Sequence, residues 1–93
     1  MSMITENEFA KICRDVAAEG DVIYKHNPLG TREETLLWMV LNILLSYLSV
    51  ADDEQPCFTG KPDTKTYKTA ISFVLRNRKE SEFDEAEYLR LLS

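Results

Sequence analysis

The apolar pattern is strongest between Leu36 and Val50, a run that contains no charged side chain. Polar residues in and just before this run recur at intervals of seven, four and three, so they fall on one narrow strip of an α-helix. They are Thr35, Asn42, Ser46 and Ser49. The remaining apolar arc is wider than the roughly 100° that a surface helix needs. We therefore expect a central helix at about 31–51 that neighbouring helices enclose on most sides.

A second helical pattern precedes this run. Its apolar residues are Phe9, Ile12, Cys13, Val16 and Ala17, followed in phase by Ile23 and Tyr24. This spacing predicts one helix from Glu6 to about His26, or two shorter helices if Gly20 acts as a C-terminal cap. Asn27 and Pro28 then end the helix, because proline restricts the residue before it.

Two further helices are predicted after the central run. The apolar stripe of the first consists of Tyr67, Ala70, Ile71, Val74 and Leu75. It indicates a helix from Asp63 or Thr64 to about Lys79. A short C-terminal helix follows. Residues 52–62 form a loop, since prolines and a glycine exclude a regular element there, and we expect Phe58 to pack from this loop onto the core.

Capping boxes mark three of the predicted helix starts. They pair Thr5 with Glu8, Thr31 with Glu34 and Asp84 with Glu87. Flanking apolar residues form two hydrophobic staples, Ile4 with Phe9 and Phe83 with Tyr88. A single strand in this pattern would have no second strand to pair with, so no β-sheet is expected. The chain is therefore predicted to be a single all-α domain, residues 1–93, that forms a compact bundle of four helices, or five if the first one breaks.

Composition and charge narrow the functional classes. The 93 residues carry a net charge of −5, which disfavours non-specific nucleic-acid binding by the whole surface. The charge is uneven, because six bases lie between Lys61 and Lys79 and five acids between Glu80 and Glu87. The uncharged run is shorter than the roughly 20 apolar residues that cross a bilayer, and acids flank it, so no membrane contact is expected.

The cysteines and the N-terminus indicate a cellular compartment. Cys13 and Cys57 are too few for a secreted disulfide scaffold and lie in no CxxC motif, so zinc binding is not indicated either. The first residues lack the basic and apolar stretches of a signal peptide. We therefore expect reduced thiols and a cytoplasmic location.

No set of residues points to catalysis. The single histidine, His26, stands at a predicted helix end, where a cation suits the helix dipole. The acidic group Asp52, Asp53 and Glu54 lacks the glycine and the ligand spacing of a calcium loop. Cys13 lies on an apolar helix face, where a thiol is unreactive. The sequence predicts no catalytic residue, no metal and no cofactor, and hence a protein that is not an enzyme.

The sharpest candidate site is the basic face of the helix predicted near 63–79. Its cations are Lys65, Lys68, Arg76 and Lys79. Three interpretations stay open: a solvated face that attracts the acids of residues 80–87, a docking site for an acidic protein, or a grip on nucleic-acid phosphates. Against nucleic acid, no Asn, Gln or Arg residues group at a helix start to read bases.

Polar residues in the central helix form a second candidate site. Asn42 and Ser46 interrupt an apolar surface, and an asparagine in such a setting can fix the register of paired helices, including those of two subunits. The alternative is a strip that faces water. The large apolar content of this helix favours self-association, so a homodimer stays open beside a monomer.

Two short segments resemble a known family. Thr5-x-x-Glu8-Phe9 and the helix start Glu33-Glu34-x-Leu36 are similar in style to the colicin-DNase immunity proteins, which are small, acidic, four-helix inhibitors. The inhibitory Asp-x-Ile-Tyr-Tyr-Pro motif of those proteins is absent, so no residue role is carried over and no family is assigned.

Taken together, the patterns predict a non-catalytic helical module of the regulatory, adaptor or inhibitor type. It would bind another protein through a charged helix face or an apolar groove. The alternative is a nucleic-acid-binding protein that uses Lys65, Lys68, Arg76 and Lys79. The sequence does not identify the protein partner.

Overall fold

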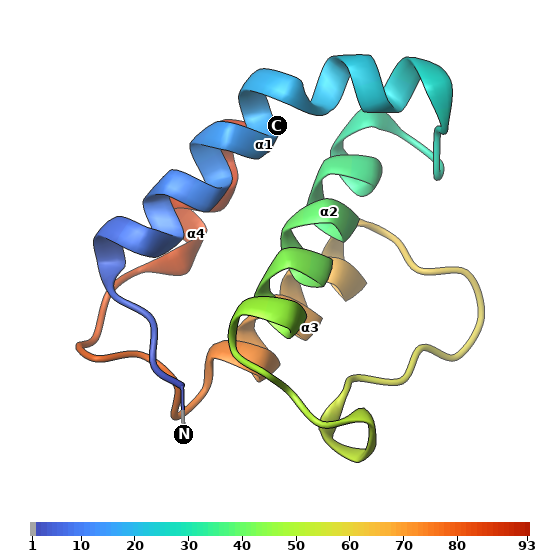
Figure 1. The fold of residues 1–93 in the computed structure, drawn as a ribbon. Coiled ribbons are helices and arrows are strands. Elements are labelled where there is room, and N and C mark those ends of the chain that lie inside the picture. Colours follow the sequence, from blue (N-terminus) through green and yellow to red (C-terminus); the bar gives the residue numbers. More distant parts are fainter. Residues whose placement is uncertain (1) are drawn as a thin grey trace.

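Four α-helices form the fold of residues 2–93, which a computed structural model describes (Figure 1). They are α1 (Glu6–His26), α2 (Arg32–Tyr47), α3 (Thr64–Leu75) and α4 (Glu85–Leu89). Single 3₁₀ turns lie at Asp52–Glu54 and Arg90–Leu92. Within this range there is no β-strand, and the expected all-α bundle, with α2 packed against both α1 and α3, is confirmed. No helix in it combines the length and the apolar character that a bilayer crossing requires.

Each helix begins directly after a capping residue whose side chain accepts a backbone N–H of the first turn. These residues are Thr5, Thr31, Asp63 and Asp84. Only the first cap forms the complete box, because the Glu8 carboxylate also accepts the backbone N–H of Thr5 at 3.0 Å. The start of α1 therefore has two of its free N–H groups satisfied.

The other two predicted boxes are incomplete. The Thr31 hydroxyl accepts the N–H of Glu34 at 3.2 Å, but it also donates to the Glu34 carboxylate, which does not reach the backbone of Thr31. Asp84 accepts the N–H of Ala86 at 3.1 Å, and not that of Glu87. Both residues still cap their helices, so the predicted starts are confirmed while the reciprocal bonds are not.

The first helix continues through Gly20 without a break, which settles the choice between one helix and two. Gly20 is buried, and a Cβ atom added to it would lie 2.6–2.9 Å from three side-chain carbons of Leu36. Leu36 is itself fully buried on α2 and has little freedom to move aside. Glycine is therefore placed here because α1 and α2 approach each other closely, at a cost in helix propensity of about 1 kcal/mol.

The helices α2 and α3 end earlier than predicted. α2 ends at Tyr47 rather than near residue 51, and Ser49 then has a left-handed φ of 52°. α3 ends at Leu75 rather than at Lys79, and Asn77 has a φ of 70°. Neither residue is the glycine that usually marks such an end, so the sequence carried no strong stop signal at these positions.

One face of α2 forms the centre of the hydrophobic core. Its buried residues are Thr35, Leu36, Leu37, Val40, Leu41 and Leu44, with Leu48 just after the helix. They join a cluster with the buried residues of α1 and with the stripe predicted for α3, all of whose members are buried. The face opposite the core, with Asn42 and Ser46, is open, and Trp38, Ile43 and Tyr47 around it are 37–43% exposed. The prediction that neighbours enclose α2 on most sides is therefore wrong for this face.

Thr35 also departs from the predicted polar strip, because it is fully buried. Its hydroxyl donates to the carbonyl of Thr31 at 3.0 Å and accepts the N–H of Leu29 at 2.9 Å. Its polar group is thus satisfied inside the core, where it fastens the turn between α1 and α2.

The helices α2 and α3 point in the same direction (Figure 1). Lys68 of α3 pairs with Glu33 near the helix starts, and Arg78 donates to the carbonyl of Leu48 just past the helix ends. A parallel pair needs a connection that runs back along its length, here about 24 Å for the 16 residues of α2. Residues 48–63 make this connection, and we call them the return segment.

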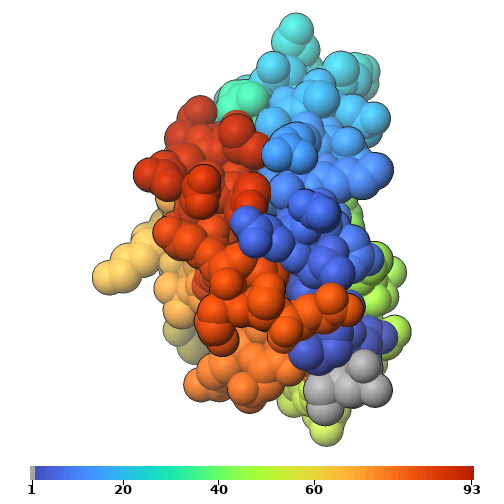
Figure 2. Space-filling view, turned by 90° about the vertical axis from the view of Figure 1, so that its left-hand side faces the viewer, coloured from blue at the N-terminus to red at the C-terminus, as the bar shows by residue number. Residues whose placement is uncertain are grey.

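The C-terminal segment packs along α1 (Figure 2). The rings of Phe83 and Tyr88 lie 5.8 and 6.0 Å from the ring of Phe9, and 6.5 Å from each other, which confirms the second staple. The Tyr88 hydroxyl donates to the carboxylate of Glu6. This bond is the main reason that the pKa of Tyr88 is raised, to about 12.

A short parallel bridge holds the first residues of the chain. The N–H of Ile4 donates to the carbonyl of Arg78 at 2.9 Å, and the Ile4 carbonyl accepts the N–H of Glu80 at 3.0 Å. Ile4 and Phe9, the two members of the first predicted staple, are both fully buried in the core.

Replacing Gly20 by alanine is expected to destabilise the protein, although alanine favours helix formation. The added methyl group overlaps Leu36, and overpacking of this kind costs about 1–3 kcal/mol. In a Leu36→Ala background the clash is absent, and the same substitution should stabilise by up to about 1 kcal/mol. Urea unfolding of the four proteins gives the double-mutant cycle. Equal effects in both backgrounds would contradict the close approach of the helices.

Candidate functional site

The four predicted cations do not lie on one helix face. Lys65 and Lys68 belong to α3, Arg76 is its C-terminal cap, and Lys79 lies beyond the turn that ends the helix. Lys79 instead forms the bridge with Ile4. The prediction of a continuous basic helix face is therefore wrong at its C-terminal end, because α3 stops before that residue.

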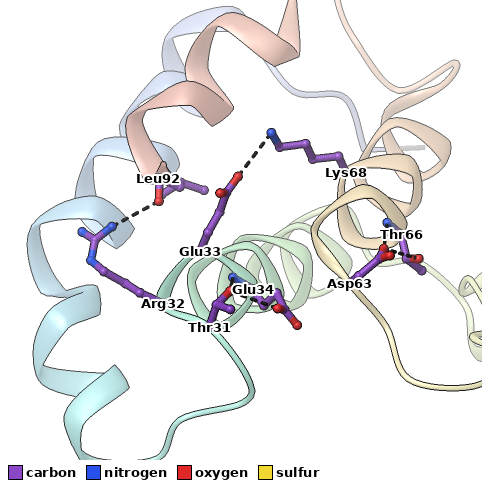
Figure 3. A network of polar contacts seen from close by, with 8 residues as sticks. All are labelled: Thr31, Arg32, Glu33, Glu34, Asp63, Thr66, Lys68 and Leu92. Carbon is purple, nitrogen blue, oxygen red and sulfur yellow. Dashed lines mark hydrogen bonds and ion pairs between the residues drawn. The ribbon is translucent and has the colours of Figure 1, made fainter.

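Lys68 and Lys79 are engaged in contacts inside the molecule. The ammonium of Lys68 lies 3.3 Å from the carboxylate of Glu33 on α2 (Figure 3). The ammonium of Lys79 pairs with Glu85, donates to the carbonyl of Phe83 at 3.0 Å and lies 4.9 Å from the centre of the Phe83 ring. Each cation links two elements of the fold, so neither offers its full charge to a partner.

The start of α3 is fixed beside this network. Asp63 accepts the backbone N–H and the hydroxyl of Thr66, both at 2.8 Å (Figure 3). The backbone hydrogen bond, followed by the one from the hydroxyl, lowers the pKa of the Asp63 carboxyl. The charged cap therefore holds the first turn of α3, on which Lys65 stands.

Lys65 and Arg76 are exposed and form no ion pair within residues 2–93. The guanidinium carbon of Arg76 lies 5.1 Å from the centre of the Phe73 ring, which is 48% exposed. α3 carries no acidic residue. Its outer face therefore combines unpaired positive charge with an exposed aromatic ring.

An open groove of about 460 Å³ lies between α3 and the return segment, and we call it the α3 groove. Its lining comes from Gln55, Pro56, Cys57 and Phe58 of the return segment and from Lys65, Thr66, Thr69, Ala70 and Phe73 of α3. The ring of Phe58 packs edge-on against Tyr67, with the ring centres 5.6 Å apart. This contact confirms that Phe58 packs inwards, although 36% of its surface stays exposed.

A second hollow of about 310 Å³ lies on the other side of Phe73. Its lining includes Val50, Glu54, Val74, Arg76 and Arg78. The Glu54 carboxylate accepts a hydrogen bond from Arg78 at 2.5 Å, which anchors the return segment beside α3. Phe73 therefore stands between two hollows, with Lys65 lining the first and Arg76 lining the second.

The second predicted site, on α2, faces solvent. The side chains of Asn42 and Ser46 are exposed, and the amide of Asn42 donates to the carbonyl of Trp38 at 2.8 Å. Neither residue is buried between helices of this chain, so neither sets helix register within it. Together with Ile43 and Tyr47 they line a shallow hollow of about 410 Å³.

The residues considered for chemistry lie apart from these surfaces or have structural contacts. His26 is the last residue of α1, and its Nδ1 lies 2.8 Å from the carbonyl of Val22. Burial raises the pKa of the Cys13 thiol to about 12. Cys57 is exposed and lines the α3 groove. Among residues 2–93, no group of three or more metal-binding side chains is arranged around a common point.

Sequence reasoning did not identify the α3 groove. Phe73 lies outside the apolar stripe that predicted α3, and this aromatic residue on a polar helix face was the available signal. The shape of the groove depends on where the return segment packs. That position is set by the pairs Arg78–Glu54 and Phe58–Tyr67, and the partners of the first pair are 24 residues apart.

Comparisons with known proteins do not assign this chain to a family. No protein-family model, curated protein or solved structure matches the chain. The features that bear on function are therefore the two surfaces just described, the α3 groove and the open face of α2.

The two thiols are expected to differ in reactivity by on the order of a hundredfold. Cys57 is exposed, whereas Cys13 is fully buried and its raised pKa keeps the thiol protonated. One equivalent of a chromogenic disulfide reagent should react rapidly with the native protein, and a second only after unfolding. Cys57→Ser should abolish the rapid phase. Loss of that phase in Cys13→Ser would contradict the assignment.

The pair between Lys79 and Glu85 should make stability depend on pH. Burial alone would raise the pKa of Glu85, but the hydrogen bond from Lys79 is the largest of the causes that together lower it below its usual 4.5. Because its pKa is lower in the folded state, the charged Glu85 carboxylate stabilises the fold above pH 4.5. This stabilisation is lost as the pH falls through the folded-state pKa. Glu85→Gln should cost about 1 kcal/mol at pH 7 and progressively less as the pH falls below 4.5.

Chemical unfolding at several pH values measures this difference. Glu87→Gln is the matched control, because Glu87 is exposed on the same helix and forms no ion pair with any residue from 2 to 93. Its effect should stay below about 0.5 kcal/mol throughout. A cost of Glu85→Gln that does not change with pH would show that charge is not its origin.

Proposed function

We propose that this protein is a non-catalytic interaction module that binds an acidic segment of another protein in the α3 groove. The observation that carries the proposal is a pair of cations that form no ion pair within residues 2–93: Lys65 lines the α3 groove, and Arg76 lines the second hollow on the other side of Phe73, so the bound segment would extend from the groove across Phe73. The two cations are 11 residues apart along α3 and its cap, which corresponds to about 16 Å.

The arrangement defines the chemistry of the bound segment. A carboxylate at each end would pair with Lys65 and Arg76, and an apolar side chain between them would contact Phe73 and Phe58. Exposed aromatic and arginine side chains are the residue types that contribute most to protein interfaces. Two carboxylates about 16 Å apart correspond to a spacing of about 11 residues in a helix or about five in an extended strand.

The size of the surface sets the expected affinity. The groove is open and its volume is about 460 Å³, so it accommodates a short segment rather than a whole domain face. Interfaces of this size belong to transient complexes. We expect dissociation constants of about 1–100 µM that increase with salt, because charge attraction contributes to binding.

Nucleic-acid binding through Lys65, Lys68, Arg76 and Lys79 has less support. Lys68 and Lys79 already pair with Glu33 and Glu85, which leaves two of the four cations for phosphates. The net charge of −5 also opposes approach to a polyanion. An acidic peptide with apolar residues uses both the charge and the aromatic surface, whereas a phosphate backbone uses only the charge.

Selection from a displayed library of random 16-residue peptides tests the proposal. Enriched peptides should carry acids on both sides of an apolar residue. Lys65→Glu, Arg76→Glu and Phe73→Ser should each weaken binding of a synthetic enriched peptide by about tenfold or more. Arg14→Glu is the control for the two charge reversals, because Arg14 is exposed on α1, forms no ion pair in the part of the chain that the structure describes and gives the same change in net charge.

The outcomes separate the candidate functions. A library without enrichment, enriched peptides without acids, or an equal effect of Arg14→Glu would each overturn the α3 groove as the binding site. A gel shift of random-sequence DNA at low salt that Lys65→Glu and Arg76→Glu abolish would favour the nucleic-acid alternative instead.

A further inference from the structure

The open face of α2 is a second surface, separate from the α3 groove. Asn42, Ile43 and Ser46 form its middle, and Trp38 and Tyr47, which project from opposite sides of the helix, border it; we call these five residues the α2 strip. All five residues are exposed, and none of them lines the α3 groove. No other element passes in front of α2 in Figure 1. Three large apolar side chains are therefore left uncovered along a single helix.

The charge of the α2 strip narrows the choice of partner. From Leu36 to Ala51 the chain has no charged residue, so this face offers no counter-charge to an acidic or basic partner. The protein as a whole carries a net charge of −5, and two copies repel each other wherever charged faces meet. The α2 strip is a face on which a second copy meets only uncharged groups.

The spacing of the side chains also suits a helix pair. Trp38, Asn42 and Ser46 form one row at intervals of four, and Ile43 and Tyr47 belong to the next row. Between these rows lies the shallow hollow of about 410 Å³ beside Asn42 and Ser46, whose short side chains leave the space. Rows of side chains at this interval pack into the grooves of another helix in the commonest class of helix pairs.

We propose that the α2 strip binds the same strip of a second copy about a two-fold axis. The middle of the strip lies at Asn42 and Ile43, so these residues meet their own counterparts near the axis. Ile43 and Tyr47 of one copy enter the hollow beside Asn42 and Ser46 of the other, and the reverse contact follows from the symmetry. Trp38 is covered at the edge of the contact.

The contact is small, so the dimer is weak. The strip extends over nine residue steps, or about 14 Å, and a contact this short buries less than the roughly 800 Å² per partner of a standard stable interface. We expect the monomer to dominate at low micromolar concentration and the dimer to become substantial at several hundred micromolar. The α3 groove stays free in this dimer, so peptide binding does not compete with it.

Trp38 provides the direct measurement, because it is the only tryptophan in the chain. As concentration rises from about 10 µM to about 1 mM, its emission should shift to shorter wavelength. Over the same range the mass from sedimentation should rise from 10.7 kDa towards twice that value. Ile43→Glu should abolish both changes. Val22→Glu is the matched control, because Val22 is an exposed apolar residue on α1, and it should leave both unchanged.

A cross-link tests the two-fold geometry independently of affinity. In a Cys57→Ser background, which removes the exposed thiol, Asn42→Cys should form a covalent dimer on mild oxidation, and Val22→Cys should not. A wild-type mass that stays at 10.7 kDa up to about 1 mM would overturn the proposal. Dimers that form equally in Ile43→Glu, or cross-links that form equally in Val22→Cys, would also overturn it. None of these results depends on the binding of acidic peptides.

Discussion

Burial of one face of α2 is the constraint on which the other elements depend. α1 approaches it so closely that Gly20 faces the side chain of Leu36, and α3 covers it with the stripe from Tyr67 to Leu75. The C-terminal turns add Leu89 and Leu92 to the same cluster. A chain of this length has little apolar surface to spare, so nearly all of its packing is concentrated on that one helix face.

The surfaces proposed for binding are consequences of how this face is covered. α3 runs parallel to α2, so the return segment has to pass back along α3, and the α3 groove lies where the two meet. Because the core uses only one face of α2, the other keeps Trp38, Ile43 and Tyr47 in solvent. One surface combines cations with aromatic rings and the other is uncharged, which is why we propose different partners for them.

The sequence predicted what local chemistry decides and missed what distant contacts decide. Thr5, Thr31 and Asp84 marked helix starts correctly, because a capping side chain bonds within its own first turn. The helix ends at Tyr47 and Leu75 were missed, because the left-handed residues that follow them, Ser49 and Asn77, are not glycines. The pairing of Lys68 with Glu33 and of Arg78 with Glu54 joins residues far apart in the chain. The α3 groove depends on such pairs, whereas Asn42 and Ser46 did mark a side of α2 that faces solvent.

The bridge at Ile4 has a consequence for how the fold opens. Its two backbone hydrogen bonds tie the start of the chain to residues 78–80, and Arg32 holds the carbonyl of Leu92 at 3.2 Å near the other end. Segments at chain ends usually fray first, because few contacts hold them. Here both are fastened to elements distant in sequence, so detaching either one exposes core residues. Amide hydrogens of Ile4 and Glu80 should then exchange with solvent in the same slow, cooperative event as those of α2. Exchange at this bridge would therefore report global unfolding.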